Sequence, residues 1–380
     1  MKAMTSRERV AATLARQPVD RLAAHESFWA ETGRRWVAEG HVRDGESLED
    51  HFDLDIRCGG WPNHVVDLDF KPVTLEETEE TRLTLDGNGA RLRWMKHKGN
   101  APEHIGFTVT DRRTWEEFAR PKLVQRDKRR IPFESYRDAR ANAARQQRFF
   151  CWSGIAPFEC MHPLCGHEHM LMGMAMDPDW VKDMVQTYVD LVLWVQQELF
   201  AAEGKPDGVW FYEDMGFKAR PFMSPEMYRE IVQPGHAQLF GYAHSLGLKV
   251  IVHSCGYVAP LVPGLIEAGM DCLQAMEVKA GMDLVELAKA HGKKIAFMGG
   301  LDVRELISND TARVDAEMDR KIPALLDMGC GYILHTDHSV PSEVNYESMK
   351  HWYEKGRSYR AKSGAQRAPK ARRAKAAVGV

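Results

Sequence analysis

The feature that most constrains the fold is a regular alternation of short apolar runs and amphipathic stretches from about residue 149 onward. The clearest apolar runs span residues 209–212, 249–252, 272–275, 295–298 and 332–334. Short apolar strands separated by helices predict a parallel sheet that is covered on both faces. Consecutive βα units of near-constant spacing favour a closed (β/α)8 TIM barrel, in the α/β class, over an open sheet. No Gly-x-Gly-x-x-Gly turn follows these strands, which argues against a dinucleotide-binding fold.

The N-terminal part of the chain predicts additions to this barrel. A helix is expected over residues 6–16 and a strand over residues 23–28, whereas residues 30–150 are mixed and charged. We therefore expect a single barrel domain over residues 1–356, with N-terminal elaborations. Residues 357–380 are basic, alanine-rich and free of acidic side chains, which predicts a disordered tail.

Composition narrows the classes of function. A net charge of −3 argues against general nucleic-acid binding. No apolar run approaches the roughly 20 residues that a membrane span needs. The charged start of the chain does not resemble a secretion signal, so we expect a cytoplasmic protein. The seven cysteines show no disulfide framework, and we expect reduced thiols. A homodimer is compatible with the sequence.

Polar side chains gather where the predicted strands end. Active sites of α/β barrels lie at the carboxyl ends of the strands, where the βα loops open. Charged, ligand-capable or glycine residues follow each of the five runs: Glu213 and Asp214; His253 and Cys255; Glu277; Gly299, Gly300 and Asp302; and His335, Asp337 and His338. This separation of polar from apolar positions predicts an active site at one mouth of the barrel.

The pair His253 and Cys255 points to a metal ion. Side chains at i and i+2 of an extended segment share a face, and imidazole nitrogen and thiolate sulfur are preferred zinc ligands. The alternative is a core histidine beside an inert buried cysteine. Carboxylates at such positions also cap helices. The cap interpretation is the better one for Asp302, while Glu213 and Asp214 fit a cap and a functional role equally.

Two further groups of cysteines and histidines receive a structural interpretation. Cys330 precedes the last strand, on the opposite rim from His253, and we interpret it as a small residue in a tight turn. A second cluster has a spacing that fits no familiar zinc module, so we expect some members to line the mouth and the others to pack. It comprises Cys160, His162, Cys165, His167 and His169.

Several motifs together resemble the uroporphyrinogen decarboxylase superfamily, whose fold is a (β/α)8 barrel. They span nearly the whole chain and comprise residues 6–10 through 18–21, Ser224 to Tyr228, His253 to Gly256, Gly299 to Asp302, and Gly331 to Pro341. The decarboxylases of the superfamily are cofactor-free and bind acidic side arms with an N-terminal arginine-rich loop. Residues 23–29 occupy that place here and contain no arginine.

The resemblance is closer to the zinc-dependent methyltransferases that work with corrinoid proteins. That branch carries His-x-Cys and a later cysteine, and His253 and Cys255 match the first two positions. The place of the later cysteine falls near His338. Nitrogen and oxygen ligands make a harder, more Lewis-acidic site, which suits polarising an ether or a quaternary amine as well as activating a thiol.

The sequence therefore predicts a zinc-dependent methyltransferase that moves a methyl group between a small molecule and a separate corrinoid protein. We expect Zn²⁺ on His253 and Cys255, with His338 or Glu213 as a further ligand, and catalytic roles for Glu213, Asp214, Glu277 and Asp337. The chain lacks the Asp-x-His-x-x-Gly signature of corrinoid modules, so the cobalamin must come from the partner protein. One alternative is a cofactor-free decarboxylase with Lys218, Arg220 and Lys279 in the mouth. The other is a non-enzymatic barrel that binds a ligand.

Overall fold

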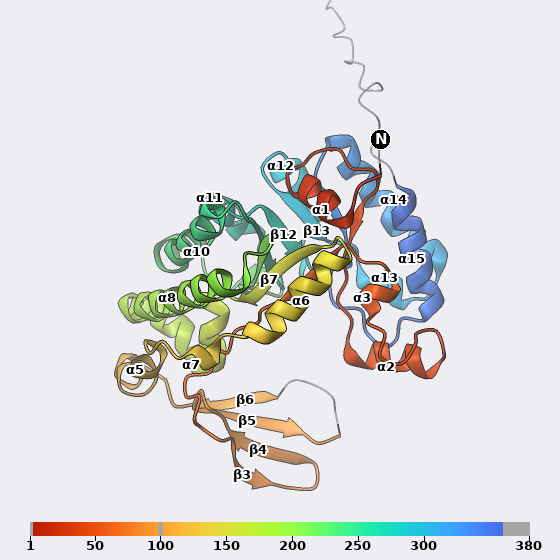
Figure 1. The fold of residues 1–380 in the computed structure, drawn as a ribbon. Coiled ribbons are helices and arrows are strands. Elements are labelled where there is room, and N and C mark those ends of the chain that lie inside the picture. Colours follow the sequence, from red (N-terminus) through yellow and green to blue (C-terminus); the bar gives the residue numbers. More distant parts are fainter. Residues whose placement is uncertain (1–2, 98–101, 360–380) are drawn as a thin grey trace, which may run out of the picture.

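A computed structural model describes residues 3–97 and 102–359 and shows an α/β barrel (Figure 1). Eight strands, all paired in parallel, follow the order β1-β14-β13-β12-β11-β8-β7-β2. Between β1 and β2, the backbone N–H of Asp55 donates to the carbonyl of Ala24 at 2.8 Å. The predicted fold class is confirmed.

Each barrel strand is short, and helices connect successive strands. The strands are β1 (Ala23–Ala24), β2 (Ile56–Gly59), β7 (Phe149–Ile155), β8 (Gly208–Tyr212), β11 (Lys249–Ser254), β12 (Cys272–Ala275), β13 (Ala296–Gly299) and β14 (Tyr332–Leu334). The longer helices are α1 (Ser6–Leu14), α2 (Ala30–Ala38), α6 (Phe133–Arg145), α7 (Pro157–Met176), α8 (Pro178–Glu203), α10 (Gln233–Ser245), α11 (Val262–Ala268), α12 (Leu284–His291), α14 (Thr311–Met328) and α15 (Tyr346–Ser358).

Shorter helical segments complete the connections. They are α3 (Leu48–His51), α4 (Arg112–Thr114), η1 (Trp115–Ala119), α5 (Arg120–Leu123), η2 (Lys128–Arg130), α9 (Pro225–Met227), η3 (Tyr228–Val232), η4 (Ala259–Leu261), η5 (Val278–Ala280) and α13 (Val303–Ile307).

The inside of the barrel is a packed core. Helix α1 places Val10 and Leu14 against the inward-facing side chains of the strands, and the large indole of Trp210 is fully buried among them. The inward positions include Ala23, Ile56, Trp210, Ile251, Cys272 and Ile333. Since side chains alternate along a strand, the next inward layer lies two residues further on, toward the carboxyl ends. That layer forms the floor of the mouth.

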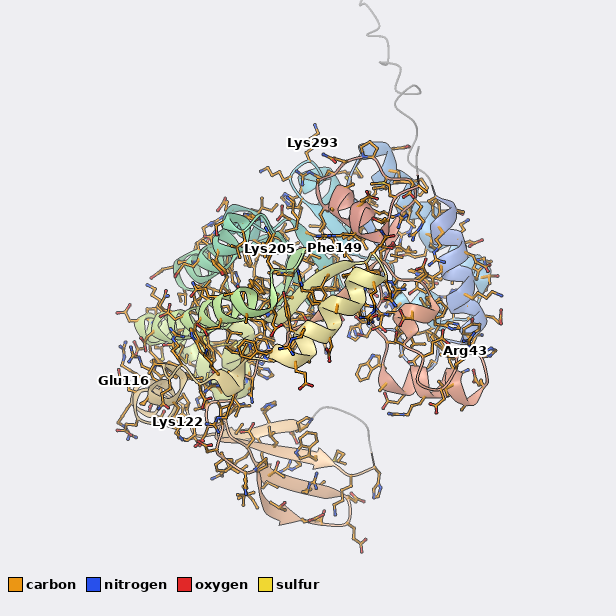
Figure 2. All side chains as sticks on the ribbon, in the orientation of Figure 1. Arg43, Glu116, Lys122, Phe149, Lys205 and Lys293 are labelled. Atoms are coloured by element: carbon orange, nitrogen blue, oxygen red, sulfur yellow. The ribbon has the colours of Figure 1, made fainter. Side chains whose placement is uncertain are left out.

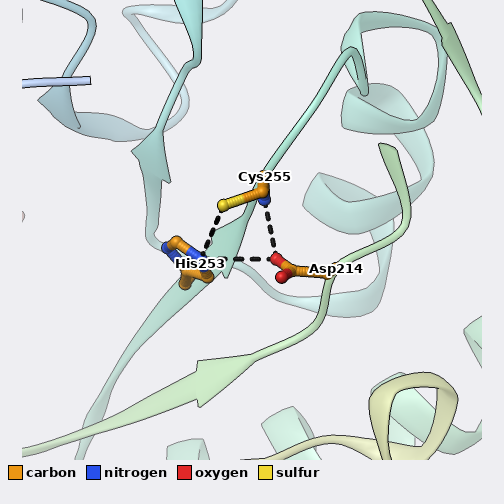
Figure 3. Close-up of side chains that lie close together, drawn as sticks. All are labelled: Asp214, His253 and Cys255. Carbon is orange, nitrogen blue, oxygen red and sulfur yellow. Dashed lines mark hydrogen bonds and ion pairs between the residues drawn. The ribbon is translucent and has the colours of Figure 1, made fainter. Parts of the chain in front are cut away.

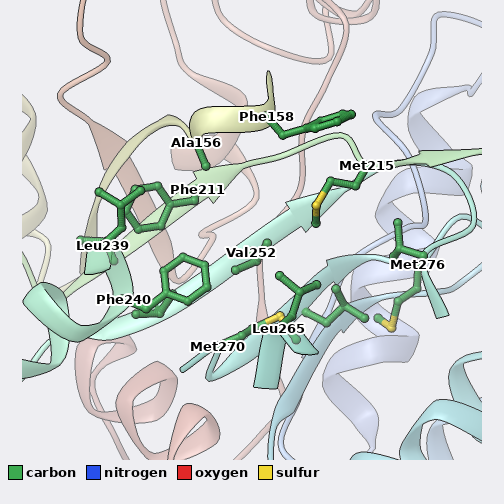
Figure 4. Packing of buried hydrophobic residues seen from close by; sticks show 14 of the residues in the cluster. Ala156, Phe158, Phe211, Met215, Leu239, Phe240, Val252, Leu265, Met270 and Met276 are labelled. Carbon is green, nitrogen blue, oxygen red and sulfur yellow. The ribbon is translucent and has the colours of Figure 1, made fainter. Parts of the chain in front are cut away.

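A second core lies between the strands and the helices around them. Phe211 of β8 and Val252 of β11 face outward and pack against Leu239 and Phe240 of α10 (Figure 4). Phe211 and Phe240 have ring centroids 5.5 Å apart. The strands therefore bury both faces, which explains their unbroken apolar sequences. Charged side chains such as Lys293 and Glu116 lie at the periphery (Figure 2).

An antiparallel sheet lies outside the barrel next to α7 (Figure 1). Its strands are β3 (Val73–Glu77), β4 (Thr81–Leu85), β5 (Ala90–Met95) and β6 (Glu103–Phe107). A small hairpin of β9 (Gly216–Phe217) and β10 (Arg220–Pro221) follows β8. Both additions leave the carboxyl ends of barrel strands, so they lie on the side of the mouth.

Two sequence predictions concern the C-terminal end of the chain and the absence of a membrane span. Helix α15 continues to Ser358, so the predicted boundary at residue 356 falls inside its last turn. The predicted basic tail lies outside the described residues from position 360 onward. Among the helices of the described chain, none has both the length and the apolar character required to cross a membrane.

Candidate metal centre

Three ligand-capable side chains converge at the mouth of the barrel (Figure 3). Nε2 of His253 lies 3.3 Å from Sγ of Cys255 and 3.3 Å from Oδ1 of Asp214. One ligand atom from each of the three residues lies within 4.8 Å of the other two. Within residues 3–97 and 102–359, no other cluster of three or more histidine, cysteine or carboxylate groups meets this spacing.

Strand ends and short hydrogen bonds position this triad. His253 is the penultimate residue of β11, Cys255 directly follows that strand, and Asp214 comes two residues after β8. The backbone N–H of Cys255 donates to Oδ1 of Asp214 at 2.7 Å. Gly256 has a φ of +73° where its backbone crosses Gly216, a conformation and a close approach that only glycine tolerates. The loop after β11 is therefore held against the loop after β8.

Gln274 orients the imidazole of His253. It occupies the position on β12 that pairs with His253, and its Oε1 contacts Nδ1 of the ring. Because an amide oxygen can only accept, Nδ1 carries the proton and donates it. Nε2 therefore faces Cys255 and Asp214, which is the ring orientation that a metal ligand needs.

The electrostatics of the triad favour positive charge at Nε2. Burial opposes protonation of His253, but hydrogen bonds and charge interactions with Asp214 and Cys255 outweigh it and raise the pKa of His253 well above its usual range. Burial likewise opposes ionisation of Asp214, yet its interactions with His253 hold the pKa of that carboxyl below its usual value. Asp214, His253 and Cys255 would offer a zinc ion one oxygen, one nitrogen and one sulfur donor, which are ligand types that zinc accepts.

Glu213 lies away from these ligand atoms, although the sequence suggested it as a metal ligand and catalytic residue. It is fully buried, and both carboxylate oxygens accept hydrogen bonds from the first turn of α7, from N–H of Phe158 and Glu159 at 2.9 Å. Oε1 also contacts Nε2 of His236 at 2.6 Å. The structure thus gives Glu213 the helix-capping role that was its alternative, while its neighbour Asp214 points into the site.

Glu277 and Asp337, two further expected catalytic residues, bind backbone amides. Oε2 of Glu277 accepts from N–H of Gly256 at 2.8 Å, and Lys279 contacts its other oxygen at 3.0 Å. Both oxygens of Asp337 accept from backbone N–H groups, of Val278 and Val303, at 2.8 Å each. These contacts make the two carboxylates anchors of the loops around the mouth.

His338, the third predicted ligand, lies near the triad without joining it. It lines a cavity of about 130 Å³ together with His253, Cys255, Gln274 and His335. A larger cavity, of about 410 Å³, lies next to it, and Ser27 and Tyr212 line both. His338 therefore borders the space where a substrate group beside the triad would lie.

The second cysteine and histidine cluster lies on α7, and none of its five members is among the residues that line the two cavities at the mouth. Cys160 and Cys165 are buried, and burial raises the pKa of the Cys165 thiol to about 12. His162 stacks on His167 at 4.1 Å between ring centroids and lies 5.0 Å from His104 of the outer sheet. Parallel stacked rings do not direct their nitrogens to a common point, so this cluster joins α7 to the outer sheet.

Sequence reasoning missed two residues of the mouth, His25 and Gln274, and assigned no role to His335. All three belong to the inward layer directly above the barrel core, which also contains Cys58, Tyr212 and His253. Each lies two residues after an inward apolar position, namely Ala23, Ile56, Trp210, Ile251, Cys272 or Ile333. Counting by two from the core positions would have found them.

Comparisons with known proteins place the chain in a family. The model of the family "Uroporphyrinogen decarboxylase (URO-D)" matches residues 94–359, which is more than half of the chain. The chain belongs to the uroporphyrinogen decarboxylase family. The match covers β7 to β14 and the whole triad, and so includes most of the barrel.

Two proteins that are similar to this chain come from Methanosarcina mazei. A methylated-thiol–coenzyme M methyltransferase is 28% identical over 156 residues, which are 41% of this chain and 40% of that protein. The aligned region thus spans less than half of the curated relative. A solved methyltransferase structure has a TM-score of 0.62 and 14% identity, covering 93% of this chain and 98% of the other. This second likeness concerns the fold.

Proposed function

We propose that this protein is a zinc-dependent methyltransferase that moves a methyl group between a small molecule and a separate corrinoid protein. The observation that carries the proposal is the convergence of Asp214, His253 and Cys255 on one point at the barrel mouth. The sequence likeness to a methylated-thiol–coenzyme M methyltransferase supports the same chemistry.

The residues of the mouth would have different roles in this function. Asp214, His253 and Cys255 would hold the ion, and Gln274 would keep Nε2 of His253 directed at it. A bound zinc ion would act as a Lewis acid on the heteroatom that carries or receives the methyl group. His338 and His335 line the small cavity where that heteroatom would lie.

Glu277 and Asp337 act as positioning residues in this proposal. Glu277 fixes the backbone at Gly256, next to Cys255, and Asp337 ties together the loops after β12 and β13. Rigid loops hold the ligand atoms in place before the substrate arrives, which is what a tight metal site requires.

The corrinoid belongs to the partner in this proposal. The chain contains no Asp-x-His-x-x-Gly signature, and the mouth, bordered by α2 and the outer sheet, is the face that a corrinoid protein would have to approach. The methyl group would cross between the two proteins at the small cavity.

The decarboxylase alternative needs cations to bind substrate carboxylates. Lys218 and Arg220 are exposed on the β9–β10 hairpin, and Lys279 pairs with Glu277. None of these three lines either cavity at the mouth. These three residues therefore give no support to the decarboxylase alternative, and Arg57, which does line the larger cavity, is paired with Glu49 at 3.3 Å.

Zinc binding by purified protein tests the proposal. After loading with zinc and removal of excess metal, we expect about one zinc per chain and its loss in Cys255→Ala, His253→Ala and Asp214→Ala, because each removes one of three protein ligands. Cys330→Ala is the matched control, since it removes a thiol on the opposite rim.

The reaction itself is followed with free cobalamin in place of the partner. Methylation or demethylation of the cobalt changes the absorbance of cobalamin, and we expect this change to require the same three side chains. A well-folded protein that binds no zinc, or zinc binding unaffected by Cys255→Ala, would overturn the proposal and favour the cofactor-free decarboxylase.

A further inference from the structure

Two histidines flank the amide group of Gln274 at the mouth of the barrel. Oε1 of Gln274 contacts Nδ1 of His253, and Nε2 of the same amide lies 3.4 Å from Nε2 of His335, the residue that follows β14. Within the part of the chain that the structure describes, the amide group has no other hydrogen bond. The two rings therefore determine whether the oxygen or the nitrogen of Gln274 faces His253.

The backbone fixes which nitrogen of His335 carries a proton. Nδ1 lies 2.5 Å from the carbonyl oxygen of Thr336, which can only accept, so Nδ1 donates to it. Burial lowers the pKa of His335 to about 4, although this hydrogen bond acts in the other direction, so the ring is neutral near pH 7. A neutral imidazole with its proton on Nδ1 has a lone pair on Nε2, the nitrogen that faces Gln274.

The neighbouring Glu26 is compatible with this lone pair. Its Oε1 lies 3.3 Å from Nε2 of His335, and a carboxylate there would attract a proton onto that nitrogen. Burial raises the pKa of Glu26 to about 8, so its carboxyl group is mostly neutral near pH 7. A neutral carboxyl group does not require a proton on the ring, and Nε2 of His335 therefore remains an acceptor.

An acceptor at His335 selects one orientation of the Gln274 amide. The NH2 group donates to Nε2 of His335, which leaves Oε1 for Nδ1 of His253. In the opposite orientation the oxygen would face a lone pair of His335, and the NH2 group would face the N–H of His253. Both hydrogen bonds would be lost at a buried site, which is costly. A histidine that holds a metal ion through Nε2 keeps the proton on Nδ1 and needs an acceptor there.

We propose that His335 is a positioning residue of the metal centre. It holds the amide of Gln274 with the oxygen toward His253, and the Gln274 oxygen keeps Nε2 of His253 directed at Asp214 and Cys255. His335 is 1% exposed and acts through Gln274 in this proposal. The inference rests on the proposed function and adds to it a residue for which the sequence suggested no role.

Nitrogen NMR of the metal-free, full-length protein with isotope-labelled histidine tests the contact between His335 and Gln274. Near pH 7 we expect His335 to carry a proton on Nδ1 and none on Nε2. The Nε2 signal should move in Gln274→Leu, because that variant removes the donor. The signals of His335 are assigned by their absence from His335→Phe. A proton on Nε2 of His335, or an Nε2 signal that Gln274→Leu leaves in place, would overturn the proposal.

Zinc affinity tests the effect on the metal centre. His335→Phe keeps a ring but removes the acceptor, so we expect the affinity, measured by competition with a chromophoric chelator, to fall about tenfold. The control is His64→Phe, which should leave the affinity unchanged. Both ring nitrogens of His64 lack a hydrogen-bond partner, and His64 lines neither cavity at the mouth.

Two further variants separate positioning from a general loss of packing. His335→Gln offers an amide oxygen in place of the ring nitrogen and should bind zinc nearly as tightly as the wild type. In the Gln274→Leu background, His335→Phe should cause no additional loss, whereas independent effects would multiply. Affinity that His335→Gln fails to restore, or losses that multiply in the double variant, would contradict an action through Gln274.

The two measurements distinguish failure of this inference from failure of the proposed function. A protein that binds no zinc but shows the contact between His335 and Gln274 overturns the metal proposal and leaves the positioning of the amide intact. A protein that binds zinc equally well in the wild type and in folded His335→Phe overturns this inference and leaves the metal proposal intact.

Discussion

The side chain of Gln274 connects the metal triad to the rest of the mouth. Its Oε1 accepts from Nδ1 of His253, and its Nε2 lies 3.4 Å from Nε2 of His335. A neutral amide in this place fixes the His253 tautomer without adding charge to the triad. Groups that orient a metal-bound histidine in this way have measurable effects on metal affinity.

Gln274→Leu should therefore weaken zinc binding about 10–100-fold, with about one zinc per chain still bound at saturation. Competition with a chromophoric chelator measures the affinity. Gln196→Leu is the matched control, because Gln196 is fully buried in α8 and its amide has no hydrogen-bond partner. An unchanged zinc affinity in Gln274→Leu would show that the His253 ring is held by other contacts.

Glu26 makes stability depend on pH. It is buried, and burial raises the pKa of its carboxyl from 4.5 to about 8 despite hydrogen bonds from Thr336 and Ser27. Above pH 4.5 the unfolded chain ionises Glu26 while the folded chain keeps it protonated. Rising pH therefore favours the unfolded state until about pH 8, and the wild type loses stability across this window.

Glu26→Gln removes this dependence. We expect its unfolding free energy, relative to wild type, to increase with pH by up to about 1.4 kcal/mol per unit between pH 5 and 8. Urea denaturation at each pH measures it, and Glu354→Gln on the exposed face of α15 should show no such trend. A constant difference between Glu26→Gln and wild type would mean that Glu26 is ionised in the folded protein.

At the level of elements, sequence patterns predicted the strands that are apolar on both faces. The runs at 209–212, 249–252 and 272–275 correspond to β8, β11 and β12. The short β2 was missed, since Arg57 interrupts its apolar character, and most of the outer sheet was missed because its strands are largely exposed. A strand can be predicted from sequence when it is buried, because burial requires apolar side chains. An exposed strand that is defined by its hydrogen bonds alone carries no such pattern.

The same limit applies to the site. The i, i+2 spacing of His253 and Cys255 is local, so sequence revealed it. The different contacts of Glu213 and Asp214 could not be predicted from neighbouring residues. They depend on the position of the first turn of α7, which is distant in the sequence. Gln274 is not a usual metal ligand, and only its pairing with His253 across β11 and β12 gives it a role.

Glu213→Ala tests the assignment of Glu213 to the α7 cap. Its loss would leave Nε2 of the buried His236 and two amides at the start of α7 without partners, and should lower the unfolding free energy by about 3–5 kcal/mol. Where the variant folds, at low temperature, zinc affinity should stay at the wild-type value. Asp214→Ala should behave oppositely, with zinc lost and a smaller effect on stability. Loss of zinc from a stable Glu213→Ala protein would return Glu213 to the ligand set.

At the scale of the whole molecule, a buried ion cluster supports the closure of the barrel between β1 and β2. Asp55 is fully buried; its Oδ2 accepts from N–H of Ala24 at 2.8 Å and from Arg21 at 2.7 Å, and its Oδ1 contacts Arg9 at 2.7 Å. Asp20 completes the cluster through Arg9. Arg9, Asp20 and Arg21 belong to the N-terminal motif whose resemblance to the family was visible in the sequence. That motif therefore has a structural role where β1 meets β2, which is called the seam below.

Asp55→Ala should destabilise the entire barrel, because it leaves the buried Arg9 and the partly buried Arg21 with one fewer partner and removes a side-chain link across the seam. We expect a loss of about 3–5 kcal/mol in the free energy of unfolding, measured by urea denaturation followed with tryptophan fluorescence. The control is Glu31→Ala, which breaks the exposed Glu31–Arg34 pair and should change stability by less than about 1 kcal/mol. β1 and β2 are the two end strands of the sheet order, and the contacts between them close the barrel. We therefore expect wild type and Asp55→Ala each to unfold in a single transition, with zinc released in that same transition. A variant that loses zinc while keeping wild-type stability would instead mean that the cluster acts on the mouth rather than on closure of the barrel.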